Sequence, residues 1–291
     1  MVKSISKIFL SVLSLAVVCL VIGCDLNVDL LGLFGSNDLN ERLTEKNNFR
    51  YLIDSERNFN YTTPVPDPSD PILFSFIVLT DTHVENGDTT DLRKIKDEII
   101  NNNARFLVNI GDMSQSGAEQ DIQAIIDLFR NEITVPCYPV IGNHDVYFGN
   151  WPVWKENIGS TRYRINGEID GEFFTLFILD SANAFIGKSQ VDWLEDELET
   201  ANGKVFVFTH SDFFVQDKIK IQQLYDQAER ARIMSLLRGK CDIMFSGHSH
   251  ERVIKEFGGV TYISIEDYKS TLTYCLVKVT KTGVIYEFKN L

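Results

Sequence analysis

The sequence predicts a layered α/β fold in which mixed β-strands alternate with helices. From Ile72 onward, short apolar runs alternate with segments of helical periodicity. The last third contains strand-like runs joined by glycine turns. With 291 residues, of which 44% are hydrophobic, the chain can bury a sizeable core in one large domain or two small ones.

The first 23 residues are typical of a secretory signal peptide. Lys3 and Lys7 precede an apolar run from residue 8 to residue 22, which is short for a membrane-spanning helix of roughly 20 residues. The run ends in Val-Ile-Gly-Cys, which resembles the bacterial lipoprotein signal, with Cys24 acylated after cleavage. We therefore expect an extracytoplasmic, membrane-anchored lipoprotein on the periplasmic or cell-surface face. An uncleaved signal anchor is the alternative.

Residues 24–71 are expected to form a polar tether between the membrane and the domain. They end in TTPVPDPSDP, whose prolines favour an extended chain over a helix or a central strand. A short helix around Leu39 to Ile53 is the one element expected here. The domain itself is expected to occupy residues 72–291.

Strands and helices are expected to alternate through most of the domain. The apolar positions of four predicted helices recur at helical spacing, as Leu92, Ile95 and Ile99; Ile122, Ile125, Ile126 and Phe129; Val191, Leu194 and Leu198; and Ile233, Leu236 and Leu237. The runs ILFSFIVLT, FLVNI, YPVI, KVFVFT and DIMFS predict strands. The segments RVIKEFGGVTYISI and TLTYCLVKVTKTGVIYEF predict antiparallel strands at the end of the chain.

The charge of the chain disfavours nucleic acid as a partner. The formal net charge is −13, and removing residues 1–24, which contain Lys3 and Lys7 but no acidic residue, takes it to −15. Such a chain repels polyanions at long range. A phosphate substrate would therefore need a local positive charge.

Cysteine carries none of the chemistry expected here. Cys137, Cys241 and Cys275 lie within or beside apolar stretches, and no CxxC motif occurs. We expect buried thiols, with one disulfide as the alternative in an oxidising compartment.

Polar residues that can bind metals follow the predicted strands. All five histidines come a few residues after an apolar run. Because open α/β sheets build their sites at the carboxyl ends of strands, these residues are expected to converge. The motifs are Asp81-Thr82-His83, Gly111-Asp112, Gly142-Asn143-His144-Asp145, His210 and Gly247-His248-Ser249-His250.

Each motif taken alone has a structural explanation. Asp-x-His occurs often by chance, Gly-Asp usually marks a turn, and His210 alone could be a hydrogen-bonded core histidine. The motifs Gly-Asn-His-Asp and Gly-His-Ser-His are more specific. Imidazoles two residues apart in an extended segment point to the same side, where one metal or two neighbouring metals can bind them.

The ordered motifs resemble those of the calcineurin-like metallophosphoesterases, and the resemblance covers roughly residues 72 to 291. It implies an α/β/β/α sandwich with two mixed β-sheets flanked by helices, and a centre of two divalent ions. One ion would be held by Asp81, His83 and His250 and the other by Asn143, His210 and His248, with Asp112 bridging both. Mixed imidazole and oxygen ligands suit Mn, Fe, Zn or Co and disfavour calcium.

The same resemblance implies hydrolysis of phosphate esters by a water or hydroxide that bridges the two ions. His144, the histidine outside the ligand set, would donate a proton to the departing oxygen. Asp145 would orient and charge His144. Gly142 is expected to let the backbone turn sharply after the strand.

The substrate is less narrowly indicated than the chemistry. Relatives that resemble cyclic-nucleotide phosphodiesterases carry paired histidines at the fourth motif, whereas this chain has a single histidine in FTHSDFFVQDK. The stretches LDSAN and SQVDWLEDEL do resemble that branch, and so a phosphodiester is favoured. The alternatives are a phosphomonoesterase, a metal-binding interaction module without catalysis, and a nuclease, which the charge disfavours.

Two sets of residues are candidates for substrate contacts, each with a structural alternative. Tyr147, Phe148, Trp151 and Trp154 could form the rim of the site, or they could be core residues. Arg162, Arg164 and Lys188 could contact phosphate, or they could be solvated surface charges.

Overall fold

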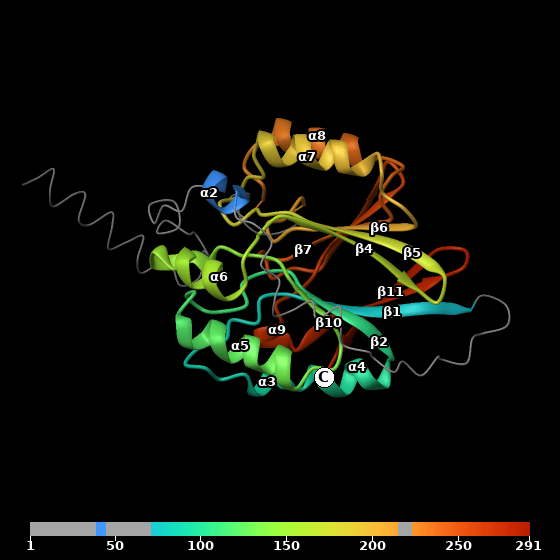
Figure 1. Cartoon of the computed structure of the whole chain (residues 1–291). Coiled ribbons are helices and arrows are strands. Elements are labelled where there is room, and N and C mark those ends of the chain that lie inside the picture. Colours follow the sequence, from blue (N-terminus) through green and yellow to red (C-terminus); the bar gives the residue numbers. More distant parts are fainter. Residues whose placement is uncertain (1–38, 45–70, 215–222) are drawn as a thin grey trace, which may run out of the picture.

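Two mixed β-sheets pack face to face between two layers of helices in the computed structural model (Figure 1). The structure describes residues 39–44, 71–214 and 223–291. The first sheet contains, in spatial order, β11 (Val284–Asn290), β10 (Thr273–Thr280), β1 (Ile72–Leu79), β2 (Ala104–Asn109) and β3 (Cys137–Pro139). The second contains β4 (Tyr163–Ile169), β5 (Glu172–Ile178), β6 (Lys204–Phe208), β7 (Ile243–Ser246), β9 (Val260–Ser264) and β8 (Val253–Phe257). This arrangement confirms the predicted α/β/β/α sandwich.

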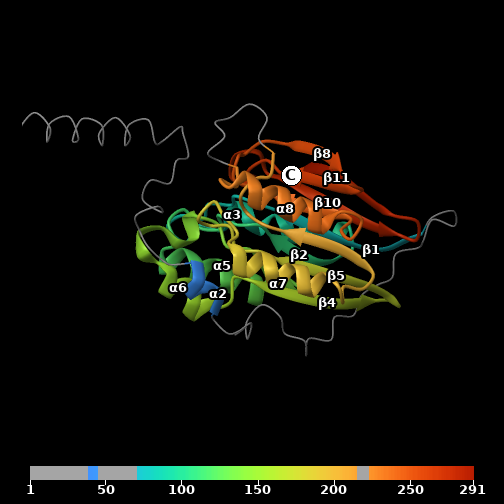
Figure 2. The same cartoon turned by 90° about the horizontal axis from the view of Figure 1, so that it is seen from above.

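Helices cover the outer face of each sheet (Figures 1 and 2). The first sheet is covered by α3 (Thr90–Arg93), α4 (Ile95–Asn101), α5 (Glu119–Asn131), α6 (Trp151–Asn157) and α9 (Tyr268–Thr271). The second sheet is covered by α7 (Lys188–Leu198) and α8 (Gln227–Leu237). The apolar positions predicted for four helices fall in α3 and α4, α5, α7 and α8 and are mostly buried.

The space between the sheets is filled by aromatic and aliphatic side chains. Phe76 of β1 stacks on Phe106 of β2 at 4.5 Å between ring centroids and meets Phe206 of β6 edge-on at 5.0 Å. Both sheets contribute buried side chains to one continuous cluster here. Burial of this apolar surface is the main term that holds the two sheets together.

The carboxyl-terminal strands pair as the sequence predicts. β8 and β9 form one antiparallel pair, and β10 and β11 form another. β9 also pairs in parallel with β7, and β10 pairs antiparallel to β1. The two terminal hairpins therefore complete different sheets. The β4–β5 hairpin and helix α6 were not predicted from the sequence.

Helix α2 (Leu39–Thr44) lies against the domain, beside α6 and the loop that precedes α7 (Figures 1 and 2). Its side chains Leu39, Arg42 and Leu43 are buried. This helix falls in the range expected to be a tether. Residues 45–53 of the expected helix, the signal peptide and Cys24 lie outside the described residues.

The three described cysteines, Cys137, Cys241 and Cys275, are buried thiols, which confirms the expectation. Within the described ranges, no helix is long and apolar enough to cross a membrane.

Candidate metal centre

The strand register brings the carboxyl ends of five strands to one edge of the sandwich. Asn109 at the end of β2 pairs with Leu79 of β1 on one side and with Pro139 of β3 on the other. In the second sheet, Phe208 of β6 pairs with Phe245 of β7. The loops that follow these strands carry the predicted motifs, and they therefore leave the sheets at the same level.

The side chains of these loops form three overlapping groups of potential metal ligands. Within each group the ligand atoms lie within 4.8 Å of one another. The groups are Asp81, His83 and His250; His83, Asp112 and His144; and Asp112, His210 and His248. The first group contains the three residues that the resemblance assigns to one ion, and the third contains His210 and His248 of the other set together with Asp112. The middle group joins them.

Asp112 occupies the centre of the cluster. Its Oδ2 lies 3.2 Å from His210 Nε2 and 3.9 Å from His144 Nε2. Its Oδ1 accepts a hydrogen bond from the backbone N–H of His144 at 2.9 Å. Asn143 Oδ1 lies 3.1 Å from His210 Nε2, so the amide oxygen and Asp112 Oδ2 both lie beside the same imidazole nitrogen. Asp112 is thus placed to contact both ligand sets.

Asp81 is held so that one carboxylate oxygen faces the histidines. Its Oδ2 accepts hydrogen bonds from Thr80 Oγ1 at 2.6 Å and from the backbone N–H of His248 at 3.0 Å. Its Oδ1 lies 3.2 Å from His250 Nε2 and 3.6 Å from His83 Nε2. The protein therefore fixes the direction of Asp81 before any ligand binds.

Five of the candidate ligands adopt left-handed backbone conformations. The φ angles are +52° for Asp81, +41° for His83, +48° for Asp112, +67° for His248 and +55° for His250. This region is sparsely populated for residues with a Cβ, and such strain concentrates at functional sites because surrounding contacts must maintain it. The strain here coincides with the ligand set.

Gly142 acts differently from the expectation. Its φ is not positive, so it is not needed for a left-handed turn. A Cβ at this position would lie 2.2 Å from both the backbone nitrogen and Oδ1 of Asp112. Gly142 therefore allows two loops from neighbouring strands to approach closely, and so brings Asn143 and His144 to Asp112.

Unpaired imidazole nitrogens make the cluster suitable for metal ions. His83 Nδ1, His83 Nε2 and His248 Nδ1 are buried without a hydrogen-bond partner. Buried polar atoms are usually hydrogen-bonded, so unpaired ones inside a group of carboxylates and imidazoles indicate a missing ligand. This donor set fits transition-metal ions.

Burial and neighbouring charges shift the ionisation of the cluster. Burial opposes the charged form of Asp81, but the positive charge of His250 holds its pKa well below the usual range. Burial acts to lower the pKa of His210, yet the charge of Asp112 raises this pKa to about 10. Burial, together with the charge of His210, lowers the pKa of His248 to about 3.

His144 lies beside the cluster with its ring orientation fixed. Its Nδ1 lies 2.8 Å from the carbonyl oxygen of Gln115, so that nitrogen carries the donated proton and Nε2 faces Asp112. The ring stands edge-on to His83 at 4.7 Å between centroids. His144 is 8% exposed, whereas His210 is fully buried. His144 is thus the more accessible of these two histidines.

Asp145 does not orient His144, contrary to the expectation. Its carboxylate accepts hydrogen bonds from the backbone N–H groups of Ser114 and Gly142, each at 2.9 Å, and from Ser114 Oγ at 3.2 Å. Consecutive residues of the short 3₁₀ helix η1 (His144–Gly149) project in different directions, so the two side chains diverge. Asp145 instead ties the loop after β2 to the loop after β3. The carbonyl of Gln115 takes the orienting role.

The aromatic rim candidates divide into two kinds. Trp151 and Trp154 are buried, and so they belong to the core. Tyr147 lies beside His144 at 4.2 Å between ring centroids, and Phe148 is 67% exposed. Of these four residues, Tyr147 therefore adjoins the cluster, and Phe148 stands edge-on to Tyr147 at 6.0 Å between ring centroids.

The basic candidates have surface partners. Arg164 donates to Glu197 and Thr200, and Lys188 pairs with Asp192. Arg162 stacks over Trp193 at 5.0 Å. The described contacts of these three residues are with neighbouring acidic, hydroxyl and aromatic side chains, and only Lys188, whose side chain is 80% exposed, is clearly a solvated surface charge.

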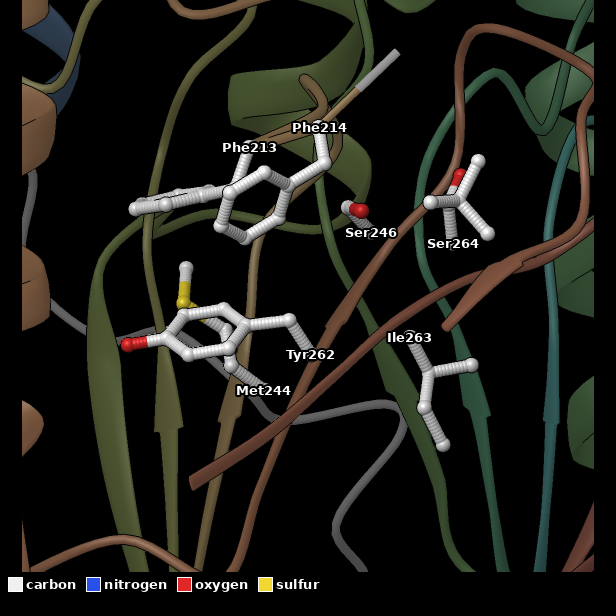
Figure 3. A pocket seen from close by; sticks show the side chains of 8 residues that line it. Phe213, Phe214, Met244, Ser246, Tyr262, Ile263 and Ser264 are labelled. Carbon is white, nitrogen blue, oxygen red and sulfur yellow. The ribbon is translucent and has the colours of Figure 1, made fainter. Parts of the chain in front are cut away.

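A small pocket lies between β7, β9 and the segment after β6 (Figure 3). Its lining residues are Phe213, Phe214, Met244, Ser246, Val253, Tyr262, Ile263 and Ser264. None of the candidate metal ligands lines it. Half of its lining residues, namely Phe213, Phe214, Met244 and Tyr262, belong to the apolar layer under α7 and α8.

Several residues that support the centre were not identified from the sequence. Gln115 and Ile110 act through backbone carbonyls, the latter 2.9 Å from His210 Nδ1, and a carbonyl leaves no sequence signature. Ser181 accepts hydrogen bonds from the backbone N–H groups of His210 and Ser211. The signal for Ser181 was its place directly after an apolar strand, in LDSAN.

Comparisons with known proteins agree with this geometry. The family model for calcineurin-like phosphoesterases matches residues 74–252. A solved dimetal phosphatase from Danio rerio superimposes with a TM-score of 0.62 at 13% identity, covering 75% of this chain and 96% of that one. At that identity the likeness concerns the fold. The metal dependence of the family and the three ligand groups together confirm the expectation of a centre for two divalent ions.

Two relatives are described as probable cyclic nucleotide phosphodiesterases. The protein from Fibrobacter succinogenes is 29% identical over 107 residues, which are 36% of this chain and 41% of the relative. The protein from Colwellia psychrerythraea is 24% identical over 164 residues, which are 51% of this chain and 60% of the relative. The chain thus spans about half the length of the two relatives that it matches.

Proposed function

The chain belongs to the calcineurin-like phosphoesterase family, and on this basis we propose that it is a metal-dependent hydrolase of phosphate esters that prefers diesters. One observation carries the proposal above all others. Buried carboxylates and imidazoles from both sheets meet at one edge, and three of the imidazole nitrogens have no hydrogen-bond partner.

Seven residues would hold the two ions. Asp81, His83 and His250 would bind the first, and Asn143, His210 and His248 the second, with Asp112 shared between them. When bound, the ions supply Lewis-acid polarisation of the phosphate oxygens and a lowered pKa for water. They also give a chain of net charge −13 the local positive charge that a phosphate ester requires.

His144 is the proton donor in this proposal. Since the Gln115 carbonyl accepts from Nδ1, the second ring nitrogen, Nε2, faces the cluster. A protonated His144 can therefore donate from Nε2 to the leaving oxygen of the ester. Asp145 contributes indirectly, because it holds the loops of Asp112 and His144 together.

A diester is favoured over a monoester by the relatives. Both relatives are described as probable cyclic nucleotide phosphodiesterases. The single histidine at the fourth motif separates this chain from the cyclic-nucleotide pattern, and so the proposal is limited to phosphodiesters as a class. Phosphomonoesterase activity is the alternative.

The test compares two chromogenic esters. The full chain is stripped with a chelator, resupplied with Mn, Fe, Zn or Co, and assayed with bis-nitrophenyl phosphate and nitrophenyl phosphate. We expect metal-dependent cleavage that favours the diester. A preference for the monoester would replace the diester assignment, and absence of turnover on both with two ions bound would favour a non-catalytic module.

We also propose that the protein is anchored to a membrane through lipid on Cys24, on the extracytoplasmic side. The support is the layout of residues 1–24, with two lysines, an apolar run and a terminal Gly-Cys. We expect the wild-type chain, but not Cys24→Ala, to incorporate labelled palmitate. Absence of label from the wild-type chain would contradict lipid anchoring.

A further inference from the structure

A buried arginine joins the N-terminal helix α2 to the loop behind the metal centre. We propose that Arg42 is a positioning residue for His210, acting through Asp180 and Ser181. The inference rests on the proposed metal centre, and it means that α2 contributes to metal binding by the domain.

Arg42 makes a bidentate ion pair in a fully buried setting. Its Nε donates to Asp180 Oδ2 at 2.7 Å and its Nη2 to Asp180 Oδ1 at 2.9 Å. The Nη2 group also donates to Asn183 Oδ1 at 2.6 Å. Both members of the pair have 0% exposed side chains. A fork of this kind fixes the carboxylate in position and in angle.

Apolar contacts seat α2 on the same loop. Leu39 is 4% exposed and Leu43 is 8% exposed. The Cδ2 of Leu39 lies so near Gly187 that a Cβ at that glycine would be 3.0 Å from it. The helix therefore covers the start of α7 as well as the segment around Asp180.

Ser181 carries the connection from this loop to the metal centre. Its Oγ accepts hydrogen bonds from Thr209 Oγ1 at 2.7 Å, from the His210 backbone N–H at 3.1 Å and from the Ser211 backbone N–H at 2.8 Å. Ser211 Oγ donates back to the Ser181 carbonyl at 2.9 Å. Asp180, the residue before Ser181, is held by Arg42. Ser181 in turn binds the backbone N–H of His210, which is a candidate ligand. Ser181 is thus the one residue between the ion pair and the backbone of His210.

The loop depends on Arg42 for charge balance. Among the described residues, Arg42 forms an ion pair with Asp180, while Gln190 bonds the backbone N–H and carbonyl of Asp180. Without the guanidinium, the buried carboxylate keeps a hydrogen bond from the Ala182 backbone N–H at 3.1 Å but loses its opposite charge, which is strongly unfavourable. The segment must then shift to reach water, and Ser181 shifts with it.

The expected consequence is a weaker site for one of the two ions. Partners that orient a metal ligand typically change metal affinity by about 10- to 100-fold when they are removed. Arg42→Met should therefore weaken binding of the ion held by His210 by about that factor and leave the other ion unchanged. The His210→Ala variant identifies which binding step belongs to that ion.

The experiment is calorimetric titration of the chelator-stripped full chain with Mn²⁺. Arg93→Met is the matched control, because Arg93 also pairs with a carboxylate, Glu132, but with a side chain that is 48% exposed. Arg42→Lys keeps the charge without the fork and should give an intermediate loss. Ser181→Ala breaks the relay while leaving the Arg42 pair intact, so it should reproduce the loss even if Arg42→Met fails to fold.

Two results would overturn the inference. One is wild-type affinity for both ions in folded Arg42→Met. The other is wild-type affinity in Ser181→Ala, which would limit the ion pair to a structural role. Failure of the proposed function is separable, because a chain that binds two ions but cleaves no phosphate ester would remove the activity and leave the metal-affinity test intact.

Discussion

The core between the sheets and the polar edge at the strand ends involve the same strands but differ in polarity and in backbone conformation. Between the sheets, Phe76, Phe106 and Phe206 pack in ordinary strand conformations with their rings in contact. At the edge, Asp81 and Asp112 are buried in left-handed conformations beside imidazoles without partners. The core stabilises the fold, and part of that stability offsets the strain and buried polarity of the edge.

This contrast predicts that substitutions at the edge affect metal binding and turnover, whereas substitutions in the core affect unfolding.

The largest effect is expected at Asp112, a residue shared by two ligand groups. Asp112→Asn removes the charge that pairs with His210 and a carboxylate that both ions would share, so we expect hydrolysis to fall by more than about 10⁴-fold, beyond the loss expected from removing a general acid. The control is Asp121→Asn, a buried aspartate that instead accepts from the Gly87 backbone N–H. Metal content and hydrolysis are measured on both, and an Asp112→Asn chain with two ions and full activity would break the comparison.

The second effect concerns His144, which adjoins the cluster but lies outside the two proposed ligand sets. His144→Ala should lower turnover by about 10²- to 10⁴-fold, the usual contribution of a general acid or base. Metal content, measured by elemental analysis, should remain at the wild-type level. Loss of both ions from this variant would instead make His144 a ligand.

The third effect tests the core. Phe206 is fully buried, so Phe206→Ala should lower the free energy of unfolding by about 3–5 kcal/mol. Phe257, 50% exposed, is the control, and its alanine variant should change stability by less than about 0.5 kcal/mol. Urea unfolding of the metal-free chains measures both. If the Phe206→Ala chain keeps its fold but binds metal more weakly than the wild type, the core and the edge are coupled.

The smallest effect is expected at Tyr147, which lies at the border of the proposed metal centre. Asn143 Nδ2 donates to Tyr147 Oη at 2.9 Å, which leaves the amide oxygen directed toward His210. Tyr147→Phe removes that acceptor, and we expect a loss of about 10-fold in affinity for the ion that Asn143 holds. Calorimetric titration measures this affinity. An unchanged value would place Tyr147 in the rim alone.

The sequence was sufficient for the parts of the fold that follow from periodicity. Helical spacing located α5 and α7, and the glycine turn at residues 258–259 located the β8–β9 hairpin. The sandwich came from the family resemblance carried by the histidine motifs. The β4–β5 hairpin was missed because its strand β4 is mostly polar and half-exposed, so its pattern is weak.

The candidate metal ligands could be predicted from the sequence, but the residues that hold them in position could not. Asp81, Asp112 and His210 follow apolar runs, and their convergence follows from the register of parallel strands. The partner of His144 is a backbone carbonyl, and adjacency in sequence pointed wrongly to Asp145. The ion pair of Arg42 with Asp180 spans 138 positions, and no local pattern indicates a contact of that range.

The most direct test of this account is to follow hydrolysis of bis-nitrophenyl phosphate while the metal-free chain is titrated with Mn²⁺. We expect activity to rise to a plateau at two bound ions per chain. In a fully loaded His144→Ala chain, we expect turnover to be lowered by about 10²- to 10⁴-fold. A wild-type chain that binds two ions and hydrolyses neither this diester nor nitrophenyl phosphate would contradict the assignment as a phosphoesterase.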